Sequence, residues 1–564
     1  MHYGKAIMKK VLLLIPILLL FLASGNLWAQ TSSLIPVKIY ISSHDDVYKF
    51  QSLGVGIEEL RNGYIEARVS EAKYAELQAL GWELEKIMPV SYDEKIVSAY
   101  HNYSWLTAKL DSVHNNYPNI TKLISIGKSV QGRELLALMV SDNPDSNENE
   151  AEIRFASTIH GDEPVGTELC IGLIDSLTQC YGSVPAIKEL VDGREIWFLP
   201  MFNPDGNTAN VRYNANGMDL NRNYPVPDGY IGSDGTYTIE LENQNMMNWV
   251  NSRHFVSGCM YHGGATVVNY QWDYSDVPAP DNDMIRELSL GYARLNDPLY
   301  NTLWPNYPDP YTVSDSGVVF GYYWYPVYGS LQDWSYQANS FIDLTIELDD
   351  NKKPAASKLP GLWSDNCQSM MFLIRQAGLG IQGLVTDSAT GLPLDFAQVE
   401  VAGIDKSVYT DSIGDYHRML LSGTYEFTFS KDGYFSKTVS GVRVNYDSLT
   451  NLDVALARDP AGVTGNPCEI VCQRIKLLKT YPNPLRNSVT VTFQLSQPSN
   501  CNLKIYNAAG QLVRIIFDRA MGPGAYGILW DGADDTGRNT ADGIYYYSLS
   551  AGGQRLTGKM VKIN

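Results

Sequence analysis

Helix-like segments and short apolar strands alternate from about residue 97 to residue 376, and this alternation limits the fold more than any other feature of the chain. The candidate strands that matter most lie at residues 153–157, 195–201, 256–261 and 341–348. Alternation of this kind is typical of an α/β domain, in which helices cover a buried sheet. We therefore expect residues 96–376 to form an α/β domain with a mixed, largely buried sheet and helices on both faces.

Polar turns that contain glycine follow three of these strands directly. They are His160-Gly161-Asp162-Glu163, Asn203-Pro204-Asp205-Gly206 and His262-Gly263-Gly264. Ligand sites in open α/β sheets form outside the carboxyl ends of the strands, where turns that are distant in the sequence meet. We expect these turns to converge on one site.

His160 and Glu163 offer an imidazole and a carboxylate from a single turn. The pair is weak evidence alone, because eight histidines and 62 acidic residues should produce roughly one His-x-x-Asp/Glu by chance. A catalytic zinc ion takes about three protein ligands and keeps one position open, and two imidazoles with one carboxylate are a known set. We predict His262 as the third ligand, because the glycines beside these histidines let the backbone approach an ion.

The first residues have the layout of a secretory signal peptide. Lys5, Lys9 and Lys10 precede an apolar run at residues 11–23, and Ala29 supplies a small residue at the expected cleavage point. The run is shorter than the ~20 residues that span a bilayer, which makes a retained membrane anchor the weaker alternative. We expect residues 1–29 to be removed on export, leaving no transmembrane anchor.

The rest of the chain divides by its pattern into further segments. Residues 30–95 look like a small α/β unit without a catalytic constellation, which makes them either a prodomain or a spacer. Helical periodicity ends near residue 378: residues 378–458 indicate a small β-sandwich, 459–474 a linker and 475–564 a second β module. We expect two small all-β sandwich domains after the α/β domain.

Short motifs in one order then indicate a family. The sequence resembles the zinc carboxypeptidases of the carboxypeptidase A clan, and most closely their regulatory N/E subgroup. The motifs are Tyr117-Pro118, Ser125-Ile126-Gly127-Lys128-Ser129-Val130-Gln131-Gly132-Arg133, His160-Gly161-Asp162-Glu163, Asn203-Pro204-Asp205-Gly206, Asp219-Leu220-Asn221-Arg222-Asn223, His262-Gly263-Gly264, Trp324-Tyr325, Gln332-Asp333-Trp334-Ser335-Tyr336 and Thr345-Ile346-Glu347-Leu348.

The resemblance implies a role for each matching residue in the chemistry. His160, Glu163 and His262 bind one zinc ion, which polarises the scissile carbonyl and lowers the pKa of water. Glu347 matches the general base and acid that takes a proton from water and passes it to the leaving amine. Arg212 matches the arginine that stabilises the developing oxyanion.

Other matches imply recognition of a peptide C-terminus. Asn221 and Arg222 match the pair that grips the terminal carboxylate, where a guanidinium fork selects a free C-terminus over an internal peptide. Tyr325 matches the mobile tyrosine that closes over the bound peptide. Tyrosines crowd this position and are alternatives to it, namely Tyr322, Tyr323 and Tyr328.

Asp273 implies specificity for C-terminal Lys or Arg, because an aspartate at this spacing lies at the base of the side-chain pocket in the N/E subgroup. Gln332 is the residue type that the subgroup has near the same pocket. The alternative for Asp273 is an exposed turn residue. Two departures put a strict basic preference in doubt: Gln271 stands where the subgroup has proline, and Ser330 where it has a second glycine.

The β modules also resemble known companions of such enzymes. Residues 380–457 are similar to the transthyretin-like domain of the subgroup. The last ninety residues are similar to C-terminal sorting domains of the bacterial type IX secretion route and to related immunoglobulin-like domains. The implied protein is an exported bacterial carboxypeptidase, secreted or at the cell surface, whose partners are peptide C-termini and a secretion machinery. The net charge of −19 argues against nucleic acid as a partner. A cell-wall peptide hydrolase of the same fold and an inactive adhesin are the alternatives.

Overall fold

The computed structural model describes residues 35–86, 97–225, 239–302, 316–459 and 475–563, with short gaps inside the first and the last two ranges. The predicted signal peptide lies outside the described residues, as does almost all of the predicted linker. The chain divides into two compact units, residues 1–91 and 92–564. None of the described helices is both long and apolar enough to cross a membrane.

The N-terminal unit contains a small antiparallel sheet and the helix α2. Its strand order is β2-β3-β1-β4, and its elements are β1 (Ile35–Tyr40), β2 (Ile57–Arg61), β3 (Tyr64–Val69), α2 (Glu71–Ala79) and β4 (Leu84–Lys86). The Ser70 hydroxyl accepts a hydrogen bond from the backbone N–H of Lys73 at 3.2 Å, which caps the first turn of α2. The described residues of this segment therefore contain both strands and a helix, as the small α/β unit predicted from the sequence requires.

The second unit contains an eight-stranded mixed sheet with the order β11-β10-β12-β9-β7-β8-β6-β5. Strands β12, β9, β7 and β8 run parallel to one another. Strand β10 pairs antiparallel with β12, β6 with β8, and the edge strand β5 with β6. The strands are β5 (Thr121–Lys128), β6 (Glu134–Val140), β7 (Ala151–Ser157), β8 (Arg194–Leu199), β9 (Phe255–His262), β10 (Ala265–Tyr270), β11 (Val318–Phe320) and β12 (Ile342–Asp349).

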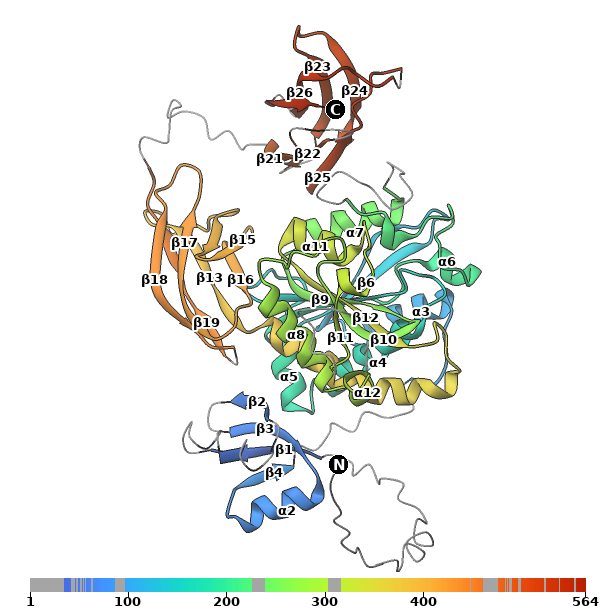
Figure 1. Ribbon diagram of the computed structural model, residues 1–564, viewed down its shortest axis with the longest axis vertical. Coiled ribbons are helices and arrows are strands. Elements are labelled where there is room, and N and C mark those ends of the chain that lie inside the picture. The colour runs from blue at the N-terminus through green and yellow to red at the C-terminus, as the bar shows by residue number, and fades with distance from the viewer. Residues whose placement is uncertain are drawn as a thin grey trace, which may run out of the picture. The chain divides into compact units, whose positions relative to one another are not determined.

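Helices pack on both faces of this sheet, as Figure 1 shows. One core contains side chains of α3, α4, α5, α8 and α12, and the other contains side chains of α7 and α11. Alternate residues of β7 enter the two cores, Phe155 the first and Ala156 the second, as the period of a strand requires. The helices are α3 (Tyr103–Asn116), α4 (Val165–Cys180), α5 (Pro185–Val191), α6 (Pro204–Ala209), η1 (Leu220–Arg222), α7 (Leu241–Asn251), α8 (Asn282–Arg294), α9 (Asp297–Tyr300), α10 (Gly321–Trp324), α11 (Leu331–Asn339), η2 (Ala356–Lys358) and α12 (Leu359–Ala377).

The expected fold class of the catalytic domain is confirmed. The four candidate strands correspond to β7, β8, β9 and β12 with ends shifted by one or two residues. Strands β5, β6, β10 and β11 were not among the candidates. In β5 most side chains are only half-buried, so this strand has no continuous apolar run to mark it.

Two β domains follow. The first holds two four-stranded sheets with its own core, built from β13 (Gly380–Asp387), β14 (Gln398–Val401), β15 (Ile404–Tyr409), β16 (Asp415–Arg418), β17 (Gly423–Ser430), β18 (Lys437–Val444), β19 (Leu449–Asn451) and β20 (Val454–Leu456). The second pairs a three-stranded and a four-stranded sheet, built from β21 (Ile475–Tyr481), β22 (Val489–Leu495), β23 (Ser499–Asn507), β24 (Leu512–Met521), β25 (Gly524–Trp530), β26 (Gly543–Ala551) and β27 (Gln554–Lys562). Both expected β-sandwich-like modules are therefore present.

Candidate active site

Three neighbouring strands bring the central polar residues to one edge of the sheet. Strands β7 and β9 run parallel with Ser157 opposite Tyr261, so the turns that follow them leave the sheet side by side. Strand β12 pairs parallel with β9 on the other side and places Glu347 opposite His262. The carboxyl ends of these strands therefore form one site, although their residues are far apart in the sequence.

The turn after β7 is tightly constrained. Thr158 has a φ of 59°, an uncommon conformation for a β-branched residue, and its hydroxyl lies 2.7 Å from that of Thr167 on α4. A Cβ at Gly161 would lie 2.0 Å from the backbone of Gly206, so only glycine fits where this turn meets α6. The sharp turn directs both His160 and Glu163 toward β9.

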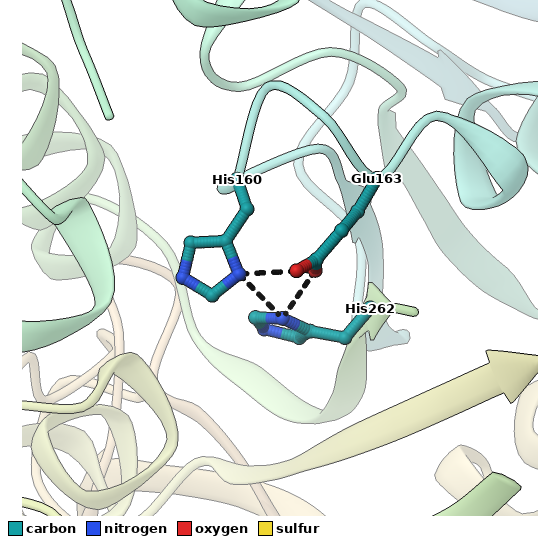
Figure 2. A group of neighbouring side chains, drawn as sticks. All are labelled: His160, Glu163 and His262. Carbon is teal, nitrogen blue, oxygen red and sulfur yellow. Dashed lines mark hydrogen bonds and ion pairs between the residues drawn. The ribbon is translucent and has the colours of Figure 1, made fainter. Parts of the chain in front are cut away.

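The side chains of His160, Glu163 and His262 converge, as Figure 2 shows. Glu163 Oε2 lies 3.0 Å from His160 Nδ1 and 3.0 Å from His262 Nδ1, and the two nitrogens are 3.2 Å apart. Each residue is only 3% exposed. Tetrahedral ligands at zinc distances of ~2.0–2.1 Å lie about 3.3 Å from one another, so this donor set fits a zinc ion. Zinc would be held by the two Nδ1 atoms and the carboxylate.

Asp219 orients the first histidine and a nearby arginine together. Its Oδ1 lies 3.2 Å from His160 Nε2, the ring nitrogen that points away from the other ligands, and its Oδ2 accepts hydrogen bonds from Arg212 Nε and Nη2 at 2.8 Å each. A carboxylate in this position fixes the ring orientation and raises its basicity as a ligand. Asp219 stands in the quoted motif Asp219-Leu220-Asn221-Arg222, but its role was not predicted.

The ligand groups favour the protonation states that metal binding needs. Burial opposes ionisation of Glu163, but the charge and hydrogen bond of His160, with a further hydrogen bond from His262, hold its pKa well below the usual value. Burial lowers the pKa of His262 to about 4. A carboxylate and a neutral imidazole are the forms that ligate zinc.

A cavity of about 190 Å³ opens over this cluster. The site residues predicted from the sequence all line it, except Gln332. Its lining comprises His160, Glu163, Arg212, Asn221, Arg222, His262, Gly263, Gly264, Ala265, Asn269, Asp273, Trp324, Tyr325, Val327, Thr345, Glu347 and Lys352. The structure therefore gathers residues from five separate sequence regions around one cavity.

Glu347, on β12, is a further acidic residue that lines the cavity. It is 9% exposed, and its Oε2 has no hydrogen-bond partner among the described residues. Burial and then the charge of Glu163 raise its pKa well above the usual value. A buried carboxyl without a protein partner and with a raised pKa has the properties of a group that exchanges protons with a ligand.

Asn221 and Arg222 line the cavity from η1. The Asn221 side-chain oxygen accepts a hydrogen bond from the backbone N–H of Leu331 at 2.9 Å, which leaves its amide N–H groups to the cavity. Arg222 Nη1 donates to the Asn221 carbonyl at 2.8 Å, which holds the guanidinium beside the amide. Together these residues offer N–H donors to an anion.

Asp273 is 3% exposed, so the alternative of an exposed turn residue is wrong. Its Oδ1 accepts hydrogen bonds from Gln332 Nε2 at 2.7 Å and from Asn269 Nδ2 at 2.9 Å. Burial raises the pKa of Asp273, so ionisation costs free energy in the empty pocket. Asn269 was missed in the sequence because no motif marks it.

Among the crowded tyrosines, Tyr325 lines the cavity and is 46% exposed, whereas Tyr322 and Tyr323 pack against the core.

Lys352 is a further cavity residue that was missed in the sequence. Its Nζ lies 3.0 Å from Glu163 Oε1 and 3.0 Å from Asp162 Oδ2, beside the ligand cluster. The departure at Ser330 has a structural explanation, since its hydroxyl caps α11.

Comparison with known proteins places the chain in a family. A family model described as "Zinc carboxypeptidase" matches residues 106–369. Carboxypeptidase M of Mus musculus is 34% identical over 419 residues, which cover 68% of this chain and 90% of that protein. The chain belongs to the zinc carboxypeptidase family. Membership of this family makes zinc the expected metal of the His160, Glu163 and His262 cluster and supports the prediction of a metallocarboxypeptidase.

The carboxypeptidase D relatives agree with this zinc carboxypeptidase assignment. Carboxypeptidase D of Anas platyrhynchos is 35% identical over 396 residues, covering 65% of this chain but only 28% of that protein, so the chain spans about a quarter of the carboxypeptidase D length. The solved structure of thrombin activatable fibrinolysis inhibitor matches at 16% identity over 61% of this chain and 98% of that one, with a TM-score of 0.44.

The β domains match models of their own. A "Carboxypeptidase regulatory-like domain" model matches residues 380–457, and an "FlgD Ig-like domain" model matches residues 485–554. The first agrees with the companion domain expected after this catalytic domain. The second identifies an immunoglobulin-like module, while the sorting function predicted for this module stays a prediction.

Proposed function

We propose that this protein is a zinc-dependent carboxypeptidase that removes single residues from peptide C-termini and prefers Lys or Arg. The observation that carries the proposal is the shared cavity, whose lining includes the metal ligands, the N–H donors of Asn221 and Arg222, and the buried Asp273. When bound, zinc would polarise the scissile carbonyl and lower the pKa of water. The chain's own residues would supply orientation, proton transfer and charge stabilisation.

Each cavity residue has a distinct part in this proposal. Arg222 and Asn221 hold the terminal carboxylate, which places the last peptide bond between the ligand cluster and Glu347. Glu347 accepts a proton from the attacking water and returns it to the leaving amine. Arg212, within 3.6 Å of Glu163, places positive charge where the oxyanion develops. Tyr325, half-exposed at the rim, closes over the peptide.

Asp273 selects the side chain of the departing residue. Burial makes the Asp273 carboxyl costly to ionise alone, and a Lys or Arg side chain offsets that cost through a charge-assisted bond. An apolar side chain leaves the acid unpaired. Gln332 and Asn269 keep the carboxylate directed by bonding the same oxygen.

The test is release of the last residue from dansyl peptides that end in Arg, Lys or Phe, with and without a zinc chelator. We expect chelator-sensitive release with Arg and Lys ahead of Phe. If no peptide shows chelator-sensitive release, the proposal of an enzyme is wrong. That result is the one expected for an inactive adhesin. Equal release from free-acid and amidated peptides would favour the cell-wall hydrolase, because that activity does not need a terminal carboxylate.

We further propose an exported protein with an N-terminal prodomain and a sorting module. The signal-like residues 1–29 support export, and the compact unit that follows supports a prodomain over a spacer, because it has a core of its own. The immunoglobulin-like match supports a separately folded C-terminal module for a secretion machinery. Cell fractionation with full-length and C-terminally truncated chains tests export and sorting. Retention of the full-length chain inside the cell would contradict both of these proposals.

A further inference from the structure

Asp333 lies behind the pocket wall that carries Asp273. It is 2% exposed and is not among the residues that line the cavity, whereas Asp273 is. Its two carboxylate oxygens accept hydrogen bonds from the backbone N–H of Asp273 at 3.0 and 3.1 Å. A contact between residues sixty positions apart, through both oxygens of a buried acid, fixes the main chain at the specificity residue itself.

The local sequence alone predicts that the Asp333 carboxylate bonds the N-terminus of its own helix. Ser330 caps α11, and Asp333 stands three residues later, where an acidic residue commonly bonds back to the N-terminus of its own helix. The Ser330 hydroxyl accepts the Asp333 N–H at 3.4 Å and also bonds the Asp333 carboxylate, but both carboxylate oxygens accept the backbone N–H of Asp273 in the loop after β10. The acid therefore serves the pocket wall rather than the helix start alone.

The Asp273 segment is held from other sides as well. The Asp273 carbonyl accepts the N–H of Val327 at 3.0 Å, and a Cβ at Gly321 would lie 2.1 Å from Asp273 Oδ1. The carboxylate thus packs directly on a glycine, in a space that tolerates little displacement. A small shift of the Asp273 backbone would move its oxygens away from the donors of Asn269 and Gln332.

We propose that Asp333 is a positioning residue for the basic-side-chain pocket, which holds the Asp273 backbone so that the Asp273 carboxylate meets the substrate cation. This inference rests on the proposed preference for Lys and Arg. Asp333 does not touch the substrate in this arrangement. It acts through the geometry of Asp273.

The charge of Asp333 and its hydrogen bonds to the Asp273 backbone have opposite effects on the Arg preference, so a variant can tell them apart. The neighbouring Asp273 charge adds to burial in raising the pKa of Asp333, so the two carboxylates repel one another. An Asp333→Asn variant removes that repulsion, which alone would favour an ionised Asp273 and a stronger basic preference. The same variant replaces one acceptor by an N–H donor facing the Asp273 N–H, which disturbs its position.

The experiment measures kcat/KM for peptides ending in Arg and in Phe with the full chain loaded with zinc. For Asp333→Asn we expect the Arg-to-Phe ratio to fall about 10-fold or more, as ångström-scale misplacement does, with the Phe rate and zinc content unchanged. Asp175→Asn is the matched control: this mostly buried acid on α4 bonds Lys109 at 2.7 and 2.8 Å away from the cavity, and its loss should leave the ratio unchanged.

Asp333→Glu is the second variant and decides the matter if Asp333→Asn does not accumulate as folded protein. It keeps the charge and both acceptors but shifts them by one methylene, so we expect the ratio to fall here too. A ratio that is unchanged or raised in Asp333→Asn, or an equal loss of Arg and Phe rates, would overturn the positioning role. A wild-type enzyme without Arg preference would instead overturn the basic pocket on which the inference rests.

Discussion

Glu347 and His262 occupy paired positions on the parallel strands β12 and β9. Side chains at paired positions project to the same face of a sheet, so the proposed base and a proposed metal ligand stand beside each other on two buried, hydrogen-bonded strands. Strand β9 is buried along its whole length, and so is β12. The distance between base and metal is therefore set by backbone hydrogen bonding rather than by a flexible loop.

Replacement of the base should separate catalysis from metal binding. For Glu347→Gln we expect one zinc per chain and near-normal binding of a competitive inhibitor, with kcat lowered about 10²- to 10⁴-fold because proton transfer is lost. Metal analysis and steady-state kinetics measure the two quantities. Loss of zinc from this variant would show that Glu347 is a ligand instead.

Removal of the carboxylate behind His160 should weaken zinc binding. Asp219→Asn keeps the shape of the side chain but loses the charge that faces His160 Nε2 and Arg212. We expect zinc affinity to fall about 10- to 100-fold, as measured by competition with a chelator. Asp175→Asn again provides a control in which affinity stays unchanged, and an unaltered affinity in Asp219→Asn would contradict the orienting role.

Arg222, which lines the cavity, should determine the requirement for a free C-terminus. A bond between charged groups contributes about 1.5–3 kcal/mol, so Arg222→Met should lower kcat/KM for free-acid peptides about 10- to 100-fold. Amidated peptides, which lack the charge, should change little. Arg222→Lys keeps a charge without the fork, and we expect an intermediate rate. A uniform loss for both peptide types would assign Arg222 to the fold instead.

The Asp273 carboxyl should lower the stability of the fold above its unfolded pKa while it provides the preference for Arg. Burial raises its pKa, so the folded state favours the protonated form and loses stability as pH rises above the unfolded value. Asp273→Asn should therefore raise the melting temperature at pH 8 while removing the Arg preference, by about 10-fold or more from the lost charged bond. Thermal unfolding and the Arg-to-Phe ratio test the two halves. A retained ratio would remove Asp273 from the pocket's chemistry.

Glu150 should make stability dependent on pH at a place far from the cavity. Burial, with the charges of Asp142, Glu148 and Glu195, raises its pKa from 4.5 to about 8, against the opposing charge of Arg194. Because the folded pKa is the higher one, this carboxyl's contribution is fully present below about pH 4.5 and is lost as pH rises through 8.

Glu150→Gln tests this by removing the titrating group. We expect the variant to unfold at a higher temperature than the parent at pH 8 to 9, and to show little difference at pH 4. The same difference at both pH values would mean that packing, and not ionisation, determines the effect.

The β-sheet strands that carry the ligands were predictable because they are buried on both faces. Such strands are continuous apolar runs, and a glycine-bearing polar turn after each one marks a place where the chain leaves the core. His160, Glu163 and His262 follow from this local pattern, and Arg222 and Glu347 from short motifs. Outer strands such as β5 were missed because a half-exposed strand has no such run.

Contacts between residues that are far apart in the sequence were decided only by the tertiary structure. The sequence determined that an α/β domain carries a His-x-x-Glu turn, a second histidine and the motif residues of a zinc carboxypeptidase, because each of these depends on neighbours along the chain. The pairing of Glu347 with His262, the carboxylate of Asp219 behind His160 and the bond from Asp273 to Asp333 depend on which strands and turns become neighbours. Register and the meeting of distant loops arise from packing of the whole domain, which no local pattern contains.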